Sequence, residues 1–168
     1  KPIYILGEII HNPEVNDQIR DMGIRFLSGP NKVADIDDLG ADDIVIIPAF
    51  GTEVATLEKL KAKGCQFVDT TCGDVMSVWK RVRTYAKNEV TSIIHGKVAH
   101  EETRATISQA TANSGHYLIV RHLDETDTVC EYIIKGGDKK AFLKQFEGNC
   151  SVGFDPDQHL RAVGVANQ

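Results

Sequence analysis

The sequence predicts an α/β fold made of two similar small lobes, each with a mainly parallel sheet and flanking helices. Two observations support this prediction. Short runs rich in β-branched residues alternate with stretches of helical period, which is typical of βαβ units. Two such units of similar size also follow one another along the chain, although they share almost no identical residues. We therefore expect a first lobe over residues 1–72 and a second over residues 73–168.

The first lobe is predicted to alternate regularly between strand and helix. Pro13 suits the first turn of a helix, and Gly64 suits the end of another. A polar loop over residues 28–40 has room for one helical turn. The predicted strands are residues 2–6, 24–27, 44–47 and 65–68, and the predicted helices are residues 12–22 and 52–63.

The second lobe begins with a helix over residues 72–88, in which apolar residues recur every three or four positions. Trp79 belongs to this apolar face, and we expect it in the core. A strand over 91–94, a helix over 101–112 and a strand over 116–120 complete a second βαβ unit. A polar stretch, a helix over 138–146, a loop and a final strand over 161–166 follow.

Composition excludes several functional classes. The chain is 42% hydrophobic and 26% charged, as expected for a globular protein. Its net charge is −5 and its basic residues are dispersed, which argues against nucleic acid as a partner. Its longest apolar runs are far below the roughly 20 residues needed for a membrane span. Four cysteines without a Cys-x-x-Cys pair favour a reducing compartment, the cytoplasm or, in a plant, the plastid stroma.

The residues that follow the predicted strands are the candidates for chemistry, because ligands bind at the carboxyl ends of parallel strands. Polar, titratable and small residues gather in these segments. They are residues 7–12, 48–52, 69–73, 95–102 and 167–168. No glycine-rich dinucleotide or nucleotide motif is present, so phosphate binding would have to depend on helix N-termini and histidines.

Cys72 follows a strand and opens a helix, a position that stabilises a thiolate. From the residues alone it is equally compatible with a nucleophile or metal ligand and with a buried structural cysteine. Cys65 is expected in the core, and Cys130 and Cys150 are expected to be structural.

Histidines and acids meet in the segment His95–Glu102, where they provide hydrogen-bond donors for an anion and a carboxyl that can carry a proton. Glu101 is equally well explained as an acid in the first turn of a helix. His11 either helps Asn12 to cap a helix or points at a ligand, and capping is favoured from the residues alone. The remaining histidines, His116, His122 and His159, are expected at the surface without partners.

Taken in order, five motifs resemble the 4-hydroxy-3-methylbut-2-enyl diphosphate reductase family, the LytB proteins. They are Gly-Glu-Ile-Ile-His-Asn-Pro at 7–13, Pro-Ala-Phe-Gly at 48–51, Asp-Thr-Thr-Cys at 69–72, His-Gly-Lys-Val-Ala-His-Glu-Glu-Thr at 95–103 and Val-Ala-Asn-Gln at 165–168. The resemblance spans almost the whole chain. Phe50 stands where many bacterial members have histidine, which resembles the cyanobacterial and plant-type branch.

This resemblance implies a reductive dehydroxylation that yields isopentenyl and dimethylallyl diphosphate, the last step of the non-mevalonate isoprenoid pathway. Family members hold a 4Fe-4S cluster with three cysteines, one from each of three similar lobes, and Cys72 matches the middle one. His11 and His100 match residues that contact the diphosphate, and Glu102 matches the acid that delivers protons. Gln168 matches a glutamine that lines the cavity. A ferredoxin- or flavodoxin-type electron donor is the expected partner.

The other two cluster cysteines have no counterpart in this chain. We therefore expect it to be part of a longer polypeptide with a third lobe, and to be inactive when isolated. Two alternatives remain open at this point. One is a non-catalytic α/β module that binds a phosphorylated small molecule or a protein. The other is a thiol enzyme in which His100 serves as base for Cys72.

Overall fold

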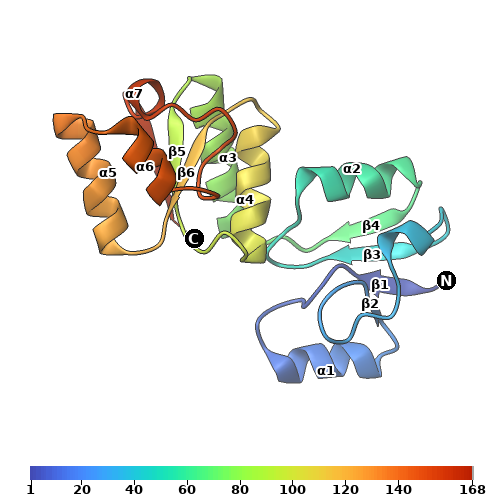
Figure 1. The fold of residues 1–168 in the computed structure, drawn as a ribbon. Coiled ribbons are helices and arrows are strands. Elements are labelled where there is room, and N and C mark those ends of the chain that lie inside the picture. The colour runs from blue at the N-terminus through green and yellow to red at the C-terminus, as the bar shows by residue number, and fades with distance from the viewer. Residues whose placement is uncertain (168) are drawn as a thin grey trace. The chain divides into compact units, whose positions relative to one another are not determined.

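The computed structural model describes residues 1–167 and confirms the α/β fold (Figure 1). The chain forms two compact units, Lys1–Met76 and a second that begins at Ser77. Helix α3 (Gly73–Lys87) contains this boundary in its first turn. Within residues 1–167, no helix is both long and apolar enough to span a membrane.

Unit 1 is a four-stranded parallel sheet in the order β2-β1-β3-β4. Its core joins the sheet to α2 and the η1 segment, with Tyr4, Leu39, Val45, Leu60 and Cys65 buried together. Cys65 is thus a core residue, as predicted. The elements in chain order are β1 (Ile3–Ile5), α1 (Pro13–Asp21), β2 (Arg25–Phe26), η1 (Ile36–Asp38), β3 (Ile44–Ile47), α2 (Val54–Ala62) and β4 (Gln66–Asp69).

Unit 2 contains a three-stranded parallel sheet in the order β6-β5-β7. Alternate residues of its strands enter two separate cores, so Ile93 packs with Leu118 while Ile94 packs with Ile119. Trp79 is buried, and its indole N–H donates to Thr106 Oγ1 over 3.2 Å. The elements after α3 are β5 (Thr91–His95), α4 (Glu101–Thr111), β6 (Tyr117–Val120), α5 (Leu123–Lys135), α6 (Lys139–Gln145), α7 (Pro156–His159) and β7 (Val163–Asn167).

Two helices of unit 2 differ from the prediction. The polar stretch after Val120 is helix α5, and the loop before β7 contains the short helix α7. Helix α5 has five β-branched residues in thirteen, and its N-cap residue His122 makes no capping side-chain bond. Burial of Val129 and Tyr132 against β6 and α6 stabilises it instead, which is a tertiary effect.

Candidate functional site

The loops at the carboxyl edge of the unit 1 sheet are joined through the backbone of one residue. Ala49, directly after β3, donates its N–H to the carbonyl of Ile9 over 3.1 Å. Its own carbonyl accepts the N–H of Cys72 over 2.9 Å. Because β3 lies between β1 and β4, this residue links the post-strand segments on both sides. The predicted gathering of these segments at one edge is therefore observed within unit 1.

Cys72 is exposed at the start of α3, and its carbonyl accepts the first helical hydrogen bond, from Met76 N–H, over 3.0 Å. The preceding turn is rigid. Asp69 Oδ1 accepts from both the backbone N–H and the hydroxyl of Thr71, over 2.9 and 2.5 Å. The hydroxyl of Thr70 donates to the carbonyl of Ile47. A thiol held on a fixed backbone at a helix N-terminus and open to solvent is suited to bind a metal centre.

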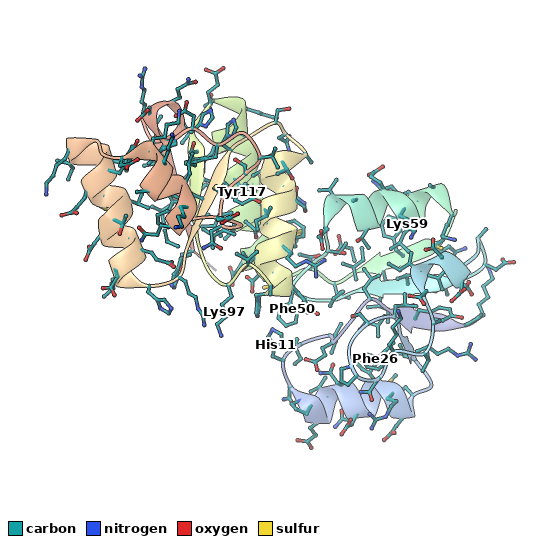
Figure 2. All side chains as sticks on the ribbon, viewed as in Figure 1. His11, Phe26, Phe50, Lys59, Lys97 and Tyr117 are labelled. Carbon is teal, nitrogen blue, oxygen red and sulfur yellow. The ribbon has the colours of Figure 1, made fainter. Side chains whose placement is uncertain are left out.

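His11 lies in the loop between β1 and α1. Its ring stacks on Phe50, with centroids 4.1 Å apart. Figure 2 labels both residues. The helix cap is Asn12, whose side chain accepts from the N–H groups of Glu14 and Val15. Capping therefore needs only Asn12. About half of the imidazole side chain of His11 is exposed, and its Nδ1 lies 3.5 Å from Glu8 Oε2.

Buried Asn16 holds the His11 loop in place. Its side-chain oxygen accepts from Ile9 N–H over 3.0 Å, and its amide donates to the carbonyl of Ile10 over 2.9 Å. The backbone before His11 is thus fixed by a polar side chain of the following helix. Such satisfied buried bonds restrict the loop to one conformation.

A pocket of about 330 Å³ lies at the carboxyl edge of the unit 2 sheet. It is lined by residues of the β5–α4 connection and of the first turn of α4: His95, Gly96, Lys97, His100, Glu102 and Thr103. His95 ends β5, and its Nδ1 lies 2.9 Å from Oδ1 of Asn167, the residue opposite it on β7. The structure thus brings together the histidines and the acid of the segment predicted as a site.

The chemistry of this pocket suits an anion that also needs a proton. Lys97 and His100 provide donors, and His100 is the N-cap of α4, where backbone N–H groups and the helix dipole favour negative charge. Glu102, in the first turn of α4, provides a carboxyl group beside these donors. Gln168, the other predicted substrate-binding residue, lies outside the described residues.

The described residues test how a 4Fe-4S cluster fits. Cys72 meets the needs of one ligand, since it is an exposed thiol on a fixed backbone. Residues 1–167 contain no group of three histidine, cysteine or acidic side chains placed to hold a metal. Cys130 is exposed on α5, and Cys150 is partly buried against the unit 2 core. Among the described residues, Cys72 is therefore the candidate for a single cluster ligand, and no complete ligand set is present.

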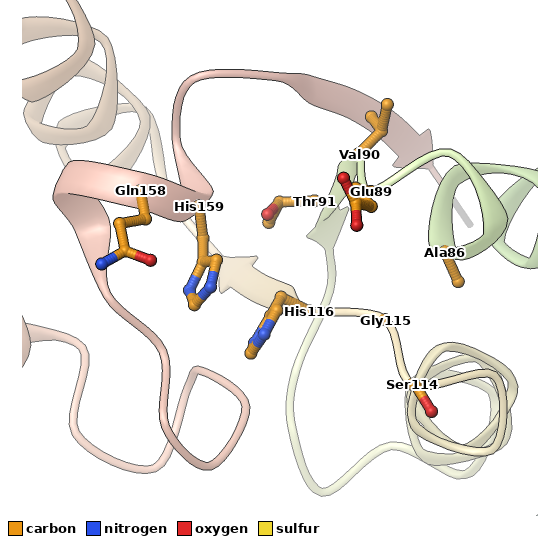
Figure 3. Close-up of a pocket in the computed structure, with 9 residues that line it drawn as sticks. All are labelled: Ala86, Glu89, Val90, Thr91, Ser114, Gly115, His116, Gln158 and His159. Atoms are coloured by element: carbon orange, nitrogen blue, oxygen red, sulfur yellow. The ribbon is translucent and has the colours of Figure 1, made fainter.

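A second pocket, of about 380 Å³, lies at the opposite edge of the unit 2 sheet, near the amino ends of β5 and β6 (Figure 3). His116 and His159, which were expected at the surface without partners, stack there with ring centroids 3.6 Å apart. His116 Nδ1 also lies 2.8 Å from Ser151 Oγ. Burial, followed by the neighbouring His159, lowers the pKa of His116. The pocket contains none of the predicted site residues and lies at the edge that parallel sheets rarely use for ligands.

The model of the LytB protein family matches residues 1–148. This chain belongs to the LytB family. Two curated relatives, both named 4-hydroxy-3-methylbut-2-enyl diphosphate reductase, come from the cyanobacteria Prochlorococcus marinus and Thermosynechococcus vestitus. Each is 49% identical over 166 residues, which is 99% of this chain. This LytB chain spans about 40% of the length of these relatives.

Solved structures give the same fold. A structure titled as (E)-4-hydroxy-3-methyl-but-2-enyl diphosphate reductase, the terminal enzyme of the non-mevalonate pathway, aligns with 98% of the LytB chain and 56% of its own, with a TM-score of 0.65 and 24% identity. The reductase from Plasmodium falciparum aligns with 75% of this chain and 37% of its own, with a TM-score of 0.63 and 28% identity. The family resemblance inferred from the motifs is therefore confirmed.

Sequence reasoning missed one residue and two contacts at these edges. Lys97 lies in a recognised motif but was not named as a site residue, although its place beside His95 and His100 was a signal. The pairing of His95 with Asn167 depends on strand register, and the stacking of Phe50 on His11 depends on two loops 39 positions apart in the chain. No local sequence pattern predicts either of these two contacts.

Proposed function

We propose that this chain is the part of a 4-hydroxy-3-methylbut-2-enyl diphosphate reductase that binds the diphosphate and supplies one cluster cysteine. The observation that carries the proposal is the pocket beside the N-terminus of α4, where Lys97, His100 and Glu102 come together. Membership of the LytB family and the names of the cyanobacterial relatives support the same assignment.

Each unit, taken by itself, has a histidine that matches a diphosphate-contacting residue of the family. His11 in unit 1 and His100 in unit 2 provide imidazole donors on loops whose backbones are held by hydrogen bonds. Lys97 adds a point charge, and the N-terminus of α4 adds backbone N–H groups. Gln168 is included on the motif alone, as a residue lining the substrate cavity.

The reaction breaks the allylic C–O bond of the substrate. Two electrons and two protons enter, water leaves, and a hydrocarbon chain bearing the diphosphate remains. A 4Fe-4S cluster bound through Cys72 supplies Lewis acidity and the path for electrons. Glu102 holds the proton for the leaving hydroxyl, and Lys97 and His100 beside it hold the diphosphate. The electrons come, we propose, from a ferredoxin- or flavodoxin-type protein.

The test uses the full-length protein after anaerobic cluster reconstitution, with reductase activity and iron content measured together. Unaltered protein should convert the hydroxylated allylic diphosphate to its two dehydroxylated products. Cys72→Ser should lose most of its iron and its activity, because a ligand is removed. Glu102→Gln should keep iron and substrate affinity but lose turnover by about 100-fold or more, the usual scale for a proton-transferring group.

Cys130→Ser is the matched control, because Cys130 is also exposed but lies within α5, outside the segments that follow the strands. It should retain iron and activity. An inactive unaltered protein with a complete cluster would contradict the proposed reaction. Equal losses of affinity and turnover in Glu102→Gln would contradict only the role of that residue.

A further inference from the structure

The stacking of Phe50 on His11 is a specific contact between two loops of unit 1. The ring centroids are 4.1 Å apart and the planes are inclined by 22°, a near-parallel arrangement. Glu8 Oε2 lies 3.5 Å from His11 Nδ1, at the edge of the same imidazole. One face and one edge of the ring are therefore in contact. About half of the His11 side chain is exposed, and the contacts with Phe50 and Glu8 restrain its ring.

The position of Phe50 is determined by the main chain around it. The N–H of Gly51 donates to the carbonyl of Pro48 over 2.8 Å and closes a tight turn. Gly51 has a φ of +76°, a conformation that favours glycine over any residue with a side chain. Ala49, directly before Phe50, carries the hydrogen bonds to the loops of Ile9 and Cys72. The aromatic ring thus lies on a short turn that is closed by the bond between Gly51 and Pro48 and held by the two backbone hydrogen bonds of Ala49.

We propose that Phe50 is a positioning residue that orients the His11 imidazole for binding a diphosphate, an inference that rests on the proposed function. Its phenyl ring offers no hydrogen bond to an anion, so its effect on the ligand passes through His11. Stacking limits rotation of the imidazole before the ligand arrives, which lowers the entropic cost of binding.

The experiment is a double-mutant cycle in the full-length, cluster-reconstituted protein, with inorganic pyrophosphate as the probe. The inhibition constant of pyrophosphate and the KM and kcat for the allylic diphosphate are measured for Phe50→Leu, His11→Gln and the double variant. Phe50→Leu should raise the inhibition constant and KM by about 2- to 10-fold, the range that aromatic stacking energies give, with a smaller change in kcat. Phe50→Tyr keeps the ring face and should retain the affinity.

The decisive result is the behaviour of the double variant. If Phe50 acts through His11, Phe50→Leu should cause no further loss once His11 is glutamine. Phe67→Leu is the matched control, because it removes a partly exposed phenyl ring from β4 of the same sheet and should leave pyrophosphate binding unchanged. Iron content and thermal midpoint show whether each variant is folded, and Phe50→Met provides a second ring-free variant.

Additive losses in the double variant, or unchanged affinity in a folded Phe50→Leu protein, would overturn the positioning role. An equal loss in Phe67→Leu would also overturn it, because the effect would then not depend on His11. Failure of the unaltered protein to bind pyrophosphate or to reduce the substrate would overturn the proposed function and this inference together. An active protein with an additive cycle would overturn this inference alone.

Discussion

At the scale of single residues, side chains form hydrogen bonds with the backbone of the segments that carry His11 and Cys72. Buried Asn16 fastens the loop that carries His11, and Asp69 fastens the turn that carries Cys72. The side chains that we propose as ligands therefore lie on backbone segments held by hydrogen bonds, which is what preorganised binding requires. His116 and His159 differ from these residues in their place, because they stack on each other at the edge of the sheet that holds none of the proposed site residues.

His116 gives a prediction for pH dependence. Burial and the neighbouring His159 lower its pKa from the ordinary value of 6.5, so the folded state takes up a proton less readily than the unfolded state. Stability should therefore be unaffected well above pH 6.5 and fall as the pH drops below it, because the unfolded chain binds more protons there. Thermal midpoints of the chain between pH 5 and 8 measure this effect, with the range chosen to bracket the histidine pKa of about 6.5.

His116→Gln should reduce the loss of stability in acid, and His122→Gln should not. His122 is a suitable control because it is exposed and makes no capping side-chain bond at the start of α5. If both variants lose stability in acid as steeply as the unaltered chain, His116 is not the group responsible.

At the scale of elements, the two sheets repeat one arrangement. In each, the first strand lies between the second and the third, and all pairs are parallel. This order places the carboxyl ends of the first and third strands side by side, as seen after the strands for Ile9 with Ala49 and at their last residues for His95 with Asn167. Strand order therefore determines which segments meet at the carboxyl edge of each sheet.

Gly115 gives a prediction at this scale, because it lies where α3 approaches the turn between α4 and β6. A Cβ there would lie 2.5 Å from Ala86 Cβ and 3.0 Å from Ala86 Cα, so a helix backbone would have to move. Gly115→Ala should destabilise the protein by about 1–3 kcal/mol in urea unfolding, the usual cost of overpacking. Gly40→Ala is the control, since nothing lies within 4 Å of its added Cβ. A loss no larger than that of Gly40→Ala would show that α3 adapts without cost.

At the scale of the whole molecule, the chain consists of two units of the same fold class, and its curated LytB relatives are more than twice its length. We propose that the remaining length includes a third lobe and the two other cluster cysteines. Residues 1–167 contain Cys72 in a suitable position but no set of three ligating side chains. Cluster binding is thus a property we assign to the longer protein.

The corresponding prediction compares the 168-residue chain with the full-length protein. After anaerobic reconstitution with iron and sulfide, the chain alone should retain far less than four irons per molecule, because one thiolate cannot hold the cluster. The full-length protein should retain close to four under the same conditions. Iron and acid-labile sulfide analysis measures both, and a complete cluster in the short chain would refute the proposed division of ligands.

The sequence by itself determined the fold class, the strands of the described residues and the family, because hydrophobic period and strand-end motifs are local patterns. It also placed Cys72, His100 and Glu102 in the segments that follow strands, and the structure has them where the next helix begins. Only the tertiary structure decided that α5 is a helix, that His116 stacks on His159 and that Phe50 stacks on His11. Each of these depends on packing between segments distant in the chain, which no local pattern encodes.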